Sequence, residues 1–128
     1  MNIPHADIFQ QVDDLLYESI YEKAVALTRP LAEAGVAWAQ GSLGSCYQCG
    51  CGVPLDLDLA THWLTLAASQ DEGLSCHNLS TLYAVQGDSL DQSEYWRAQA
   101  HRLGWDLLTQ PWPNGPLQGD PIAPVATK

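Results

Sequence analysis

One spacing pattern occurs three times along the chain and limits what the chain can fold into. Small, apolar and aromatic residues recur at offsets of 0, 3, 7, 8 and 11, and successive copies begin 36 and 33 residues apart. The three copies are Ala24-Leu27-Leu31-Ala32-Gly35, Ala60-Trp63-Ala67-Ala68-Asp71 and Ser93-Trp96-Ala100-His101-Gly104. The first four offsets place side chains on one face of an α-helix. The fifth marks the C-terminal end of the helix, where the left-handed conformation suits glycine and costs aspartate slightly more.

A second pattern precedes the last two copies and predicts a further helix in each. Leu43 and Tyr47 recur 36 residues later as Leu79 and Tyr83, and a loop that contains glycine follows both pairs. First helices are therefore predicted over residues 37–49 and 74–86.

The helices that carry the repeated alanines are predicted over residues 56–70 and 89–103. Asp56 and Ser89 stand at their starts, and both are expected to be N-caps because their side-chain oxygens accept the first free amides. Each unit is thus a helical hairpin. Since one hairpin leaves an apolar face uncovered, neighbouring hairpins are expected to stack.

These residues resemble the Sel-1-like repeat, a relative of the tetratricopeptide repeat, over about residues 21–104. The matching markers are Ala39, Leu43, Gly44, Tyr47, Gly50, Gly52, Val53, Asp56, Ala60, Trp63, Ala67 and Ala68. The second copy departs from the family pattern, with Ser75, Ser80 and Ser93 where alanine or glycine is usual. The resemblance implies an α/α superhelix that holds other proteins. The predicted fold is all-α, a short α/α solenoid of antiparallel helical hairpins.

The predicted organisation is one helical-repeat domain over residues 1–108 and an irregular tail over 109–128. The domain divides into a degenerate hairpin at 4–35 and repeats at 37–71 and 73–104. Five prolines fall within residues 109–128 and forbid a regular helix there. The apolar residues around the junction are expected to cap the open end of the stack: Trp105, Leu107, Leu108 and Trp112.

The charge balance narrows the class of partner. Fifteen acidic residues against five basic ones give a net charge of −10. Binding to nucleic acid needs clustered lysine and arginine, so nucleic acid and anionic membrane surfaces are excluded as expected partners. A basic protein is favoured instead, because opposite fields speed encounter. The chain starts without the basic and continuously apolar segments of a signal peptide, which predicts a cytoplasmic protein.

The cysteines are the main candidates for chemistry. In a reducing compartment all four, Cys46, Cys49, Cys51 and Cys76, are expected to be mostly free thiols with a structural or incidental role. The alternative is a zinc site that combines them with His62 or His77. Some secreted members of the Sel-1-like family carry a disulfide in each repeat. Cys76 matches one of its two positions, but Ala68 stands at the other.

No sequence motif of a hydrolase, a phosphate-binding loop or a dinucleotide-binding site is present in the chain. We therefore predict no catalytic residue, no cofactor and no metal, and expect that the chain is not an enzyme.

A concave groove along the first helices is the predicted partner-binding site. Residues one step before the packing seam pair up 36 residues apart: Trp38 with Leu74, Ser42 with Asn78, Ser45 with Thr81 and Cys49 with Val85. Trp38 is expected either to anchor the partner or to cover the preceding hairpin. Acids near the turns form a predicted docking rim or a solubilising edge: Asp58, Asp71, Glu72, Asp88 and Asp91.

The features together predict a non-catalytic module that binds one other protein. Its small size, acidity and cytoplasmic character favour a bacterial immunity protein that binds and neutralises a toxin or effector, which the charge suggests is basic. The alternative is an adaptor or regulatory scaffold that bridges two proteins through its groove and its tail. A homodimer is a further possibility, because a second copy could cover the open end of a short stack.

Overall fold

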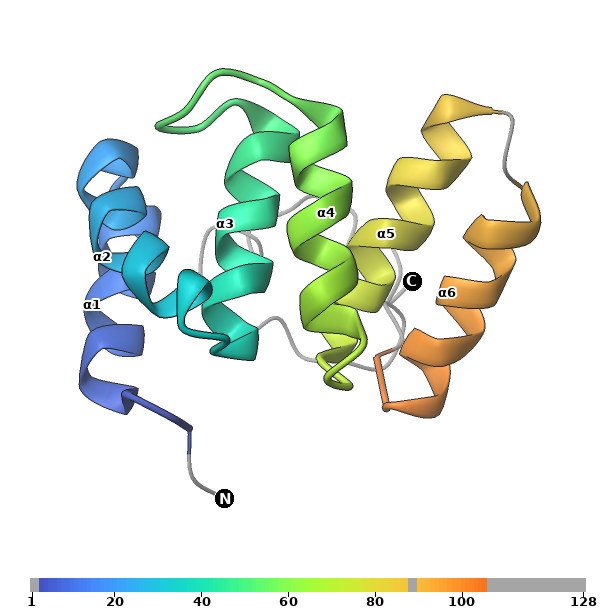
Figure 1. The fold of residues 1–128 in the computed structure, drawn as a ribbon, viewed down its shortest axis with the longest axis horizontal. Coiled ribbons are helices and arrows are strands. Elements are labelled where there is room, and N and C mark those ends of the chain that lie inside the picture. Colours follow the sequence, from blue (N-terminus) through green and yellow to red (C-terminus); the bar gives the residue numbers. More distant parts are fainter. Residues whose placement is uncertain (1–2, 88–89, 106–128) are drawn as a thin grey trace, which may run out of the picture.

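The computed structural model describes residues 3–87 and 90–105, and within them it contains six helices and no strand. The helices are α1 (Ala6–Tyr17), α2 (Tyr21–Glu33), α3 (Ala37–Cys49), α4 (Leu57–Ala68), α5 (Gly73–Gln86) and α6 (Leu90–Arg102). They form three antiparallel hairpins stacked side by side (Figure 1). The chain is therefore an all-α solenoid of helical hairpins, as the spacing predicts.

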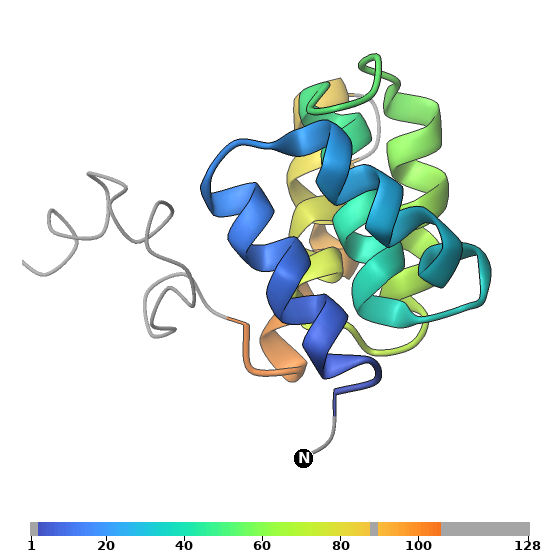
Figure 2. The same ribbon diagram turned by 90° about the vertical axis from the view of Figure 1, so that its left-hand side faces the viewer.

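Contacts between helices follow this order along the stack. α2 packs on α3 and α4 packs on α5, which joins each hairpin to the next. α3 and α5 also touch directly, so the first helices of the last two hairpins share one face of the stack. Figure 2 looks along the stack from the end formed by α1 and α2.

The ends of α2, α4 and α6 confirm the helix ends that the three copies of the spacing pattern predict. Gly35, Asp71 and Gly104 adopt φ angles of 97°, 65° and 87°, all in the left-handed region predicted for them. After each, the next amide donates a hydrogen bond back across five residues: Val36 to Leu31, Glu72 to Ala67 and Trp105 to Ala100, with N···O distances of 3.0, 3.3 and 2.8 Å. This bonding closes the last turn of a helix. The repeated sequence pattern therefore ends all three helices in the same way.

The α1–α2 turn uses the same device without a glycine. Ser19 has φ 63°, and the Ile20 amide donates to the Leu15 carbonyl at 2.8 Å. No glycine or proline marks this turn in the sequence, so its position was not predicted. α2 contains Pro30 and runs through it without a break.

The core lies where the hairpins meet. Leu43, Leu64 and Leu79 are completely buried. Gly44 lies so close to α4 that a Cβ atom in its place would stand 2.8 Å from Leu64 Cγ. The absence of a side chain at Gly44 therefore lets α3 and α4 approach closely at this position.

Of the two predicted N-caps, Asp56 is confirmed. Its Oδ1 accepts a hydrogen bond from the Leu59 amide at 3.0 Å, and α4 begins at the next residue. Ser89 lies outside the described residues, as do the tail at 109–128 and the expected capping residues Leu107, Leu108 and Trp112.

Candidate protein-binding face

One stripe of α3 stays out of the core. Eight of the thirteen residues of α3 are buried, whereas Ser42 and Ser45 are half-buried and Cys49 is exposed. These three residues follow one another at helical spacing along a single face. The sequence placed all three on the concave side, and the structure leaves this face of α3 only partly covered.

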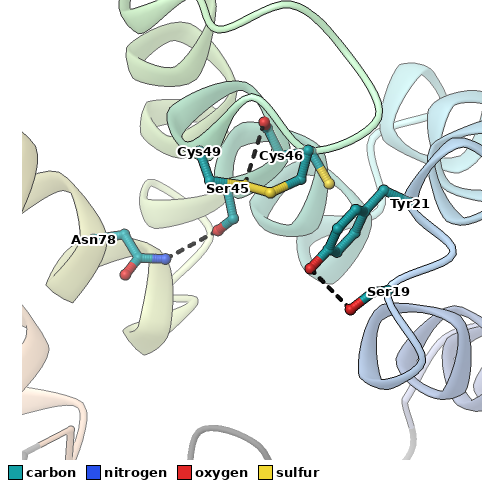
Figure 3. The surroundings of a disulfide bond; sticks show 7 residues. Ser19, Tyr21, Ser45, Cys46, Cys49 and Asn78 are labelled. Carbon is teal, nitrogen blue, oxygen red and sulfur yellow. Dashed lines mark hydrogen bonds between the residues drawn. A yellow bond between two sulfur atoms is a disulfide. The ribbon is translucent and has the colours of Figure 1, made fainter.

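The matching stripe of α5 is more open. Leu74 and Asn78 are half-buried, Thr81 is exposed, and 77% of the Val85 surface is accessible. Asn78 Nδ2 donates a hydrogen bond to Ser45 Oγ at 3.0 Å (Figure 3). This bond joins the two stripes into one surface, here named the binding face: Ser42, Ser45, Cys49, Leu74, Asn78, Thr81 and Val85.

The hydrogen bond of Asn78 does not follow the spacing of 36 residues. Asn78 bonds Ser45, which precedes it by 33 residues, and not Ser42, which precedes it by 36. The difference of three residues is about one helical turn. For this one side chain, therefore, the hydrogen-bond partner differs from the residue that the repeat spacing pairs with it.

Trp38 lies at the end of the stripe, but its side chain is buried by contacts within the chain. Only 9% of its surface is exposed. Its Nε1 donates a hydrogen bond to the Pro4 carbonyl at 2.7 Å, and its ring meets that of Phe9 edge to face at a centroid distance of 5.0 Å. Of the two roles left open for Trp38, the structure favours covering the preceding hairpin. It is not an exposed anchor.

The expectation of four free thiols is wrong for two of them, because Cys49 and Cys51 form a disulfide. Gly50 lies between them at φ 73° and turns the chain sharply after α3. The turn brings the two Cα atoms within 5.4 Å, inside the range that a disulfide requires. The sequence Cys-Gly-Cys at a helix end is the signal from which this disulfide could have been predicted.

The predicted acidic rim is divided between the two ends of the helices. Asp58 and Asp91 lie in the first turns of α4 and α6, whereas Asp71 follows the last turn of α4. Asp58 and Asp71 are thus separated by nearly the length of a twelve-residue helix, about 18 Å. The acids do not form one continuous rim. Asp88 lies outside the described residues.

Glu72, placed in the rim by the sequence, instead caps α5. Its Oε1 accepts a hydrogen bond from the Ser75 amide at 3.0 Å and another from the Ser75 hydroxyl. Burial raises the pKa of the Glu72 carboxyl above its usual range and outweighs the lowering by these two hydrogen bonds. Its role is structural, since its Oε1 accepts both hydrogen bonds within the fold.

The shifted pKa of Glu72 predicts a pH-dependent stability. With its pKa raised, the folded chain holds a proton that the unfolded chain has already released, so stability falls as pH rises from the ordinary value toward the raised one. Glu72→Gln, which keeps an oxygen acceptor, should therefore be more stable than the natural chain at pH 7. The advantage should vanish near pH 4. Thermal unfolding at several pH values checks this, with Glu33→Gln at an exposed site as the control.

The described residues hold no group of three or more metal-ligating side chains in reach of one ion. Burial raises the pKa of the Cys46 and Cys76 thiols and lowers the pKa of His77, whose ring stacks on Trp105 at a centroid distance of 6.1 Å. The binding face itself offers hydroxyl, amide and aliphatic groups. Such a surface can form hydrogen bonds and apolar contacts with another protein.

Comparison of the chain with protein-family models, with curated protein sequences and with solved structures found no match. Among the helices that the structure describes, none is both long and apolar enough to cross a membrane.

Proposed function

We propose that this chain is a non-catalytic module that binds one other protein through its binding face. The observation that carries the proposal is the side-chain arrangement on α3 and α5. α3 buries eight of its thirteen residues and α5 buries five of its fourteen, yet each leaves one stripe open, and the Asn78–Ser45 hydrogen bond joins these stripes. A preformed, partly polar surface on rigid helices suits protein recognition, because little ordering is needed on binding.

The charge of the chain supports a basic partner. Acidic residues outnumber basic ones fifteen to five, and the arginines already have contacts within the fold. Arg29 donates to the Tyr47 hydroxyl, Arg97 lies 4.0 Å from Glu94, and Arg102 pairs with Asp71 at 3.2 Å. The excess of negative charge therefore remains available to attract a partner of opposite sign.

Within this class we propose a bacterial immunity protein that neutralises a basic toxin or effector. The support is the small acidic chain, together with the resemblance of its repeat to the Sel-1-like family. A single preformed face suits a single tight partner. An adaptor would need a second binding site, for which residues 109–128 are the sequence candidate.

A pull-down from lysate of the native host tests this proposal. With the full chain as bait, low salt should retain one dominant basic protein in equal molar amount, and high salt should reduce its capture. Expression of that protein alone should harm the host, and co-expression of this chain should restore growth.

Removing residues 109–128 distinguishes the two roles. A truncated immunity protein should keep its partner and still protect the host, whereas a truncated adaptor should lose one of two partners. If no stoichiometric partner is captured at either salt concentration, the binding function is contradicted.

A further inference from the structure

The disulfide between Cys49 and Cys51 lies at the edge of the binding face. Cys49 is the last residue of α3 and is exposed, whereas Cys51 is half-buried in the loop that follows. Ser45, one helical turn earlier, faces the same way and holds the hydrogen bond from Asn78 (Figure 3). A molecule bound on the face can therefore reach the sulfur of Cys49.

This disulfide holds no two elements of the fold together. It joins residues only two positions apart, and the stabilisation that a disulfide gives grows with the length of chain that it closes. Other contacts already fix the loop: the Cys51 amide donates to the Cys46 carbonyl at 2.9 Å, and the Asp56 amide to the Tyr47 carbonyl at 3.1 Å. Gly52 rests against the backbone of Tyr21. We therefore expect the bond to contribute little to the stability of the fold.

The other two cysteines lie in a different environment. Cys46 and Cys76 are free thiols with 5% and 1% of their surfaces exposed. Burial raises the pKa of both thiols, which keeps them in the unreactive protonated form. The chain therefore combines one accessible disulfide with two shielded thiols, and exposed disulfides are the labile class.

We propose that Cys49–Cys51 is a thiol–disulfide exchange site whose substrate is a pair of cysteine thiols in a protein bound on the binding face. The identity of the substrate as a bound protein rests on the function proposed above. The exchange chemistry itself does not, because it follows from the position of the two sulfurs.

The exchange reaction takes place in two steps. A substrate thiolate attacks Cys49 Sγ, and the bond to Cys51 Sγ breaks. Cys51 leaves with the electron pair and takes a proton from water, so Cys49 carries a mixed disulfide. A second thiolate of the same substrate then attacks the substrate sulfur and releases Cys49 as a thiolate. The substrate gains a disulfide, and its two electrons reduce the Cys49–Cys51 pair.

Reduced glutathione serves as the probe, since it is a small peptide thiol that needs no binding partner. The full chain, purified without reductant, should show two free thiols when denatured and almost none reactive when folded. After glutathione is added and the reaction is quenched with acid, mass spectrometry should find the mixed disulfide on Cys49. Complete exchange should then expose two rapidly alkylated thiols, at Cys49 and Cys51.

The matched control is Cys49→Ser combined with Cys51→Ser. This variant should keep the helical content and unfolding temperature of the natural chain but show no rapidly alkylated thiol after glutathione. Four free thiols in the denatured natural chain, or a disulfide that glutathione opens only after unfolding, would overturn the proposal. Neither result bears on partner capture, so failure of the exchange site and failure of the binding function are distinguishable.

Discussion

Replacing Trp38 by alanine should lower the free energy of unfolding by about 3–5 kcal/mol, the usual cost of removing a large buried aromatic side chain. The indole is 9% exposed, contacts the ring of Phe9 and donates a hydrogen bond to the Pro4 carbonyl. The change therefore removes the contact between Phe9 of α1 and Trp38 of α3. Chemical denaturation followed by circular dichroism measures the loss, with an equal denaturant slope showing that the fold is retained.

Trp38→Phe is the control for this prediction. It keeps most of the apolar contact and loses the donor, so its cost should be near the value of one hydrogen bond, about 1 kcal/mol. If Trp38→Ala leaves stability unchanged but abolishes partner binding, the residue is an interface anchor and its assignment to the fold is wrong.

Placing valine at Gly44 should destabilise the chain by about 1–3 kcal/mol through overpacking. A Cβ at this position meets Leu64 Cγ at 2.8 Å and the Leu64 backbone nitrogen at 3.0 Å. Part of the clash is therefore with main chain, which cannot rotate away. The higher helix propensity of valine than of glycine offsets only a few tenths of a kcal/mol. Denaturant midpoints measure the net effect.

A double mutant tests whether the clash of the valine at position 44 is with the Leu64 side chain. Combining Gly44→Val with Leu64→Ala removes the side chain that the valine strikes, so the double variant should be less destabilised than the sum of the two single variants. Ser42→Val, two residues earlier and half-buried, is the control and should cost much less. Purely additive effects would mean that α3 and α4 are not in close contact at Gly44.

The sequence specified the regular parts of this fold because local chemistry and packing agree there. The predicted helix over 37–49 coincides with α3. Asp56 caps α4 as expected, and Gly35, Asp71 and Gly104 all take the left-handed conformation. Each of these features depends on a few residues near in sequence, so the residue types alone reveal it.

Features that depend on tertiary neighbours were harder to predict. Ser19 adopts a left-handed turn without a glycine, and Trp38 is covered only because α1 folds over it. Glu72 looked like surface charge but lies against Gly41 and Ser75, where burial raises its pKa. In the candidate site, the open stripes were predicted by spacing. Their alignment and the Cys49–Cys51 bond required the structure.

The affinity of the captured partner for two matched variants tests the central claim, that the binding face on α3 and α5 holds the partner. Thr81→Arg places a bulky cation on that face, and Gln92→Arg adds the same charge to an exposed position of α6. Titration calorimetry should show about tenfold or greater weakening for Thr81→Arg and little change for Gln92→Arg. Equal effects of the two variants, or none from Thr81→Arg, would contradict the account.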